Sequence, residues 1–63
     1  MECYFVHHNG GALIKELDLQ FIPRINDEIY CKDTDDFIAN YVVKGILHNY
    51  VDNEIVISLE KVK

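Results

Sequence analysis

Apolar and polar residues alternate along the last third of the chain, over residues 45–59. Alternation with a period of two is typical of β-strands that bury one face. The turn residues Asp52 and Asn53 interrupt the pattern, which predicts a hairpin with a two-residue loop in which Val51 faces Glu54. The face that this register buries holds Ile46, His48, Tyr50, Ile55, Ile57 and Leu59.

Turn signals divide the rest of the chain into further short strands. The predicted strands are Glu2–His8, Ala12–Ile22, Glu28–Cys31, Phe37–Tyr50 and Glu54–Val62. A helix over residues 36–45 is the alternative for one segment, but Tyr41 and Val43 are residue types that favour strands. Gly45 most simply marks a β-bulge with Lys44, which brings Tyr41 and Val43 onto the buried face.

The first hairpin turns at an Asn-Gly-Gly sequence, whose residues accept the positive φ of tight turns. A loop of the two glycines places Tyr4 and Val6 inward, whereas a three-residue loop at Asn9–Gly11 places Cys3 and Phe5 inward. A glycine in the last loop position suits a turn with a bulge, so we favour the second arrangement. The returning strand then shows one apolar face, formed by Leu13, Leu17, Leu19 and Phe21.

The corner between the second and third strands contains the only proline and the only arginine. Pro23 has no backbone N–H and ends the second strand, and Asn26 and Asp27 then turn the chain. The guanidinium of Arg24 could form a bidentate pair with a carboxylate of a partner. Alternatively, it could pair with Asp27 or Glu28 across the turn. We interpret this corner mainly as a turn.

Five strands in 63 residues predict one domain, residues 1–63, built as a small antiparallel SH3-like barrel. Closing the sheet removes exposed edges. A sandwich needs more strands. An OB barrel usually carries a helix after its third strand, where only the five residues 32–36 are available.

Two segments, FIPRINDEIY and YVVKGILHNY followed by IVISLE, resemble a pattern found in small, mostly uncharacterised bacterial and phage-associated proteins. The resemblance covers residues 17–60 and implies an SH3-like or related small β-barrel, without any activity. Asn26 stands where glycine is usual in that pattern, and asparagine tolerates the left-handed conformation. The chain has no tryptophan and no ALYDY-type strand, so recognition of proline-rich peptides is not implied.

The net charge of −5, from six Lys and Arg against eleven Asp and Glu, disfavours nucleic acid as a partner. Binding of single-stranded nucleic acid by exposed aromatics of a small barrel remains the alternative function. Two cysteines without a secretory signal pattern indicate a reduced, cytoplasmic compartment. No apolar run approaches the roughly 18–20 residues that span a bilayer.

Metal binding is one chemistry that the residue types allow. The candidate ligands are Cys3, His7, His8, Cys31 and His48. None of them shows the close pairing that structural zinc sites use, and we expect no metal or cofactor. Acidic residues 33, 35 and 36 resemble the start of a calcium loop, but Ile38 and Lys44 stand where an EF-hand needs glycine and glutamate.

Catalysis by Cys31 as nucleophile and His48 as base finds no further support, because nothing in the sequence places the two residues together. We therefore predict a non-enzymatic protein-interaction module. Its surface is the outer face of the last hairpin, where apolar side chains point away from the core. The predicted interface residues are Arg24, Tyr30, Val42, Leu47 and Val56. The expected partner is another protein or a second copy of the chain in a homodimer.

Overall fold

The structure is a computed structural model that describes residues 2–62. Within this range the chain forms strands and connecting turns, without a helix. The strands are β1 (Glu2–His7), β2 (Leu13–Asp18), β3 (Glu28–Lys32), β4 (Ile38–Asn49) and β5 (Glu54–Lys61). The alternative of a helix over residues 36–45 is wrong, because β4 runs through most of that segment.

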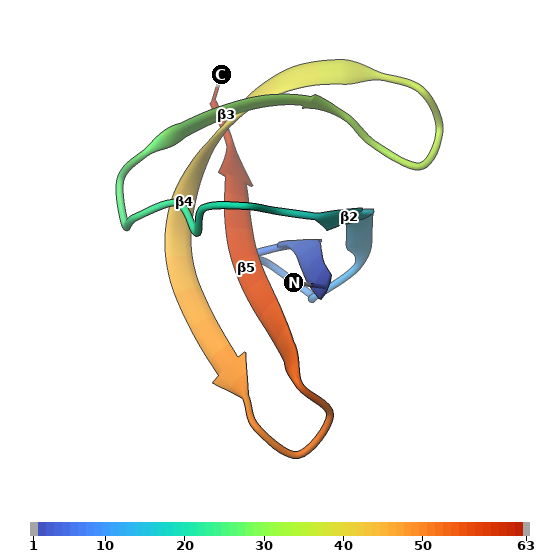
Figure 1. Cartoon of the computed structure of the whole chain (residues 1–63). Coiled ribbons are helices and arrows are strands. Elements are labelled where there is room, and N and C mark those ends of the chain that lie inside the picture. The colour runs from blue at the N-terminus through green and yellow to red at the C-terminus, as the bar shows by residue number, and fades with distance from the viewer. Residues whose placement is uncertain (1, 63) are drawn as a thin grey trace.

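The five strands form one sheet in the order β2-β1-β5-β4-β3, which curls into a half-barrel (Figure 1). The prediction of an all-β fold is confirmed. The prediction of an entirely antiparallel sheet is wrong at one place, because β1 lies parallel to β5. Cys3 lies opposite Ile55 there, and His7 lies opposite Leu59. The local alternation pattern reports which face a residue occupies, and it carries no information on the direction of a distant partner strand.

The concave side of the sheet carries the core. Its buried members are Cys3, Phe5, Ile14, Tyr41, Val43, Ile55, Ile57 and Leu59. The inward position of Cys3 and Phe5 confirms the favoured arrangement of the first hairpin. The hairpin loop is one residue longer than predicted, because the His7 N–H donates to the Ala12 carbonyl at 2.8 Å and encloses residues 8–11.

A bulge in β2 changes the predicted apolar face of that strand. Phe5 pairs with Lys15 and Val6 with Leu13, so Ile14 is the extra residue. Ile14 turns into the core and Leu13 is left exposed, which corrects the prediction that Leu13 faces inward. The strand also ends at Asp18, four residues before the predicted Ile22, and Phe21 is exposed.

The last hairpin keeps the predicted faces but shifts its register by two residues. Asn49 pairs with Glu54 and His48 with Ile55, so the loop spans residues 50–53 instead of two residues. The Asn49 side-chain oxygen accepts the N–H groups of Val51 and Asp52 at 3.0 and 3.2 Å, which stabilises the longer loop. An even shift leaves every side chain on its own face.

The consequences of this shift fall at the end of the hairpin. Ile55, Ile57 and Leu59 are buried as predicted, whereas His48 and Tyr50 extend past the core and are exposed. The predicted bulge is confirmed, because the pairing shifts between Val43 and Gly45.

The corner before β3 is a hydrogen-bonded turn, as predicted. Asn26 takes a φ of 74°, the left-handed conformation that asparagine tolerates. The Asp27 N–H donates to the Arg24 carbonyl, and the Arg24 N–H donates to the Asp27 carboxylate at 2.8 Å. The Asn26 N–H also donates to the Val43 carbonyl, which ties the corner to the middle of β4.

We predict that Ile57→Val lowers the free energy of unfolding by about 0.5–1.5 kcal/mol, because it removes one methylene from a fully buried site in the central strand. Urea unfolding followed by circular dichroism measures the change. Ile38→Val removes the same group from a side chain that is 52% exposed, and we expect less than about 0.5 kcal/mol there. Equal losses at the two positions would show that Ile57 does not lie in the core.

Candidate protein interface

A row of side chains crosses the convex, outer face of the sheet. Leu47 on β4 lies opposite Val56 on β5, and Val56 lies opposite Tyr4 on β1. Tyr4 in turn pairs with Glu16 on β2. Leu47 is 61% exposed, while Val56 and Tyr4 are half-buried. We call Leu47, Val56 and Tyr4 the outer row.

Two of the predicted interface residues lie on the same face but outside the outer row. Val42 is half-buried between Glu28 and Glu60, its partners on β3 and β5. Tyr30 pairs with Asn40 near the edge of the sheet and is 71% exposed. The bulge between Val43 and Gly45 separates these residues from Leu47 along β4.

Arg24 belongs to the corner and not to the outer row. Its link to Asp27 runs from the backbone N–H to the carboxylate, so the predicted pairing across the turn exists without the guanidinium. The side chain is exposed. The structure therefore brings Leu47 and Val56 together, places Tyr30 and Val42 in a second group, and leaves Arg24 apart.

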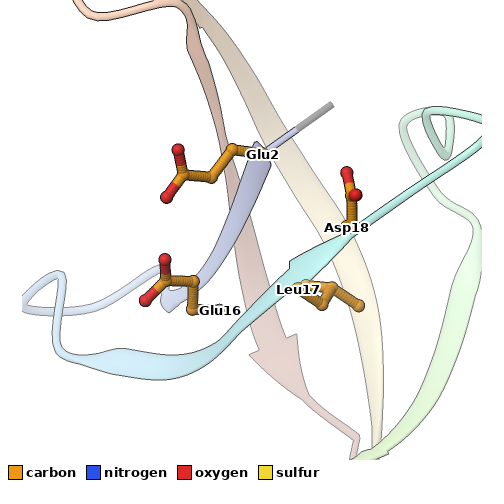
Figure 2. Close-up of a pocket in the computed structure, with 4 residues that line it drawn as sticks. All are labelled: Glu2, Glu16, Leu17 and Asp18. Carbon is orange, nitrogen blue, oxygen red and sulfur yellow. The ribbon is translucent and has the colours of Figure 1, made fainter.

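An acidic cluster that the sequence pattern did not predict adjoins the outer row. Figure 2 shows the carboxylates of Glu2 and Glu16 on the same side of strands β1 and β2, with Asp18 nearby. The Tyr4 hydroxyl donates a hydrogen bond of 2.7 Å to Glu2 Oε1. Glu2 and Tyr4 are two residues apart, so the sequence alone places both side chains on one face of a strand. Their proximity to Glu16 could be predicted only with the register of the first hairpin.

The shared hydrogen bonds change the acidity of all three groups. The Tyr4 hydroxyl, and then Glu16, lower the pKa of the Glu2 carboxyl. The hydrogen bond with Glu2 raises the pKa of Glu16, so Glu16 holds its proton more tightly than a free glutamate. The hydrogen bond to Glu2 also raises the pKa of the Tyr4 phenol, because ionising it would place two negative oxygens in contact.

The residues proposed for metal binding or catalysis are dispersed over the sheet. Within residues 2–62 no three His, Cys, Asp or Glu side chains gather as a metal site. Cys3 lies in the core, and burial raises the pKa of the Cys31 thiol, which disfavours the reactive thiolate. The His7 ring packs edge-on against Tyr41, and the His48 ring stacks on Tyr50.

The acidic loop after β3 uses its first carboxylate to hold its own backbone. Asp33 Oδ1 accepts the N–H groups of Asp35 and Phe37 at 2.9 and 3.0 Å. The Asp36 backbone adopts a φ of 65° within the same turn. These bonds give Asp33 a structural role in closing the loop between β3 and β4.

Comparison with protein-family models, curated proteins and solved structures yields no match. Among the described residues, no helix has the length and apolar character needed to cross a membrane.

We predict that Glu16→Gln raises the melting temperature at pH 7, because it removes a charge held beside Glu2. A raised folded-state pKa contributes stability below the unfolded pKa and loses it as pH rises through the folded value. The advantage of Glu16→Gln should therefore shrink as pH falls through the raised folded-state pKa of Glu16, and it should be lost below the ordinary range of glutamate. Thermal unfolding at several pH values measures it.

Glu60→Gln provides the control, because it removes the same charge from an exposed position of β5 outside the acidic cluster. An equal, pH-independent gain from both variants would mean that only net charge matters. It would contradict the specific coupling of Glu16 with Glu2.

Proposed function

We propose that this chain is a non-enzymatic, cytoplasmic protein-interaction module that associates with a second copy of itself. The observation that carries the proposal is the outer row, in which Leu47 and Val56 pair directly on the convex face. Leu47 is 61% exposed although it lies within a regular strand. Neighbouring apolar side chains on an exposed sheet face make this surface a candidate contact for another protein.

The single-sheet architecture of the described residues supports the same proposal. The core fills only the concave side of a single curled sheet, so no element of the described chain is left to cover the outer row. A domain of this size rarely gains more than about 3–5 kcal/mol from its own core. A protein partner on the convex face would bury the apolar side chains that the fold itself leaves accessible.

Charge favours a protein over a nucleic acid as the partner. Glu2, Glu16 and Asp18 lie beside the outer row, and a phosphate backbone approaching this face would meet carboxylates. The central location of Tyr4 between Glu16 and Val56 also suits a protein contact, because tyrosine offers a large apolar body and a polar tip.

As the type of fold we propose an SH3-like small barrel, supported by the curl of the five-stranded sheet. The parallel pairing of β1 with β5 departs from the antiparallel form of that prediction. A bacterial or phage setting belongs to the same proposal and rests on the resemblance of residues 17–60.

The test is the mass of the protein in solution. We expect wild type to elute in size-exclusion chromatography with light scattering at a mass above that of one chain, and Val56→Glu to lower that mass. The substitution places a charge in the centre of the outer row, next to Tyr4 and Leu47. A dissociation constant at least tenfold weaker is the expected result.

Val51→Glu is the matched control, because Val51 is 91% exposed at the tip of the last hairpin and lies outside the outer row. It should leave the mass unchanged. A monomeric wild type at high micromolar concentration, or equal effects of the two variants, would refute self-association through the outer row. Circular dichroism of each variant confirms that the sheet remains folded.

A further inference from the structure

Strand β3 forms one edge of the sheet, with β4 on one side only. The hydrogen bonds just beyond its two ends reveal which residues face β4. The Val43 N–H donates to the Asp27 carbonyl, and the Asp33 N–H donates to the Phe37 carbonyl. Hydrogen-bonded positions alternate along an antiparallel pair, so the odd-numbered residues of β3 bond with β4.

The even-numbered residues of β3 therefore direct their backbone groups away from the sheet. These residues are Glu28, Tyr30 and Lys32, all of them exposed. Within residues 2–62 no other segment pairs with this side of β3. A row of free N–H and C=O groups at a sheet edge is a template for another strand.

The other edge strand, β2, carries two features that oppose such pairing. A bulge at Ile14 breaks its regular spacing, and Lys15, opposite the buried Phe5, carries a charge on the core side. Bulges and inward-pointing charges are devices that keep edges from pairing. β3 has neither, because its five residues pair with β4 in an unbroken register.

The sequence of β3, Glu-Ile-Tyr-Cys-Lys, is complementary to itself when it is read in the opposite direction. Pairing two copies about Tyr30 places Glu28 opposite Lys32 at both ends. It also places tyrosine opposite tyrosine on the outer face, and Ile29 opposite Cys31 on the core side. Opposite charges and aromatic pairs are the cross-strand combinations that stabilise antiparallel strands.

We propose that the β3 edge is an interaction surface for the β3 edge of a second copy of this chain, in antiparallel register with a two-fold axis at Tyr30. The outward-facing residues Glu28, Tyr30 and Lys32 then form the hydrogen-bonded pairs of the new ladder. The two five-stranded sheets join into one continuous sheet with both convex faces on the same side. This surface differs from the outer row, and the inference does not depend on it.

The same register brings Asp27 beside Asp33 of the second copy at each end, just beyond the five paired residues. The carboxylate of Asp27 accepts the Arg24 N–H, and that of Asp33 accepts two N–H groups of its own loop. Both negative groups are thus held within their own turns, beside the ends of the new ladder.

Disulfide trapping tests the register. Tyr30→Cys in a Cys31→Ala background brings two thiols opposite each other, with Cα atoms about 5.5 Å apart in a hydrogen-bonded pair. That separation lies within the range of about 4.4–6.8 Å that a disulfide accepts. We expect rapid formation of a covalent dimer under mild oxidation at micromolar protein, seen on a non-reducing gel.

Lys32→Cys in the same background is the register control. In the proposed dimer the two Lys32 positions lie four residues apart along the strands, about 13 Å, which is too far for a disulfide. Trapping at Lys32 as fast as at Tyr30 would overturn the proposed register, and no trapping at either position would overturn the edge contact.

Repeating the trapping in the Val56→Glu background separates this inference from the proposed function. Trapping of Tyr30→Cys that persists there shows an edge contact independent of the outer row. A wild-type dimer that Val56→Glu disrupts, without any trapping at Tyr30, would support the outer row and refute the edge.

Charge exchange offers a second test without cysteines. Glu28→Lys places like charges opposite each other at both ends of the ladder, and Lys32→Glu does the same with negative charges. Each single variant should weaken dimerisation of the Val56→Glu protein several-fold, and the double exchange Glu28→Lys/Lys32→Glu should restore it. Failure of the double variant to recover would contradict the pairing.

Discussion

The structure depends on the central position of β5, which pairs with β1 on one side and with β4 on the other. Its inward residues Ile55, Ile57 and Leu59 are all buried. The buried residues of both neighbouring strands belong to the same core cluster. Everything apolar that the fold buries is gathered on this one concave side. A single sheet can cover only one of its faces, and that constraint leaves Leu47 and Val56 available on the other.

The same constraint explains where the chemistry of the surface lies. Because strand residues alternate between faces, the core positions Cys3 and Phe5 dictate that Glu2 and Tyr4 face outward. The register of the first hairpin then places Glu16 opposite Tyr4, whose hydroxyl donates a hydrogen bond to Glu2. The acidic cluster is thus a by-product of the alternation that builds the core.

Local pattern was sufficient for much of this fold. The period-two alternation located all five strands, and the predicted bulge beside Gly45 correctly turned Tyr41 and Val43 inward. The left-handed conformation of Asn26 also followed from residue type. These features depend on steric preferences within a few residues, which the sequence expresses directly.

Features that depend on distant partners could not be predicted in the same way. Nothing in the local pattern indicates that β1 runs parallel to β5, or that Asn49 side-chain bonds lengthen the last loop. The bulge at Ile14 exchanged the faces of two adjacent apolar residues, which alternation alone cannot resolve. For the site, the exposure of Leu47 was predictable, while its separation from Tyr30 by the bulge was visible only in three dimensions.

The parallel contact between β1 and β5 also constrains the order in which the protein is made. The two strands lie at opposite ends of the described chain, so the ribosome delivers β1 long before its central neighbour exists. Until β5 emerges, β1 is paired with β2 only and its other side has no partner strand. Closing the loop between two strands that are so far apart in sequence is slow. The sheet can therefore be completed only after β5 has left the ribosome, and the chain is most exposed to incorrect strand pairing before that moment.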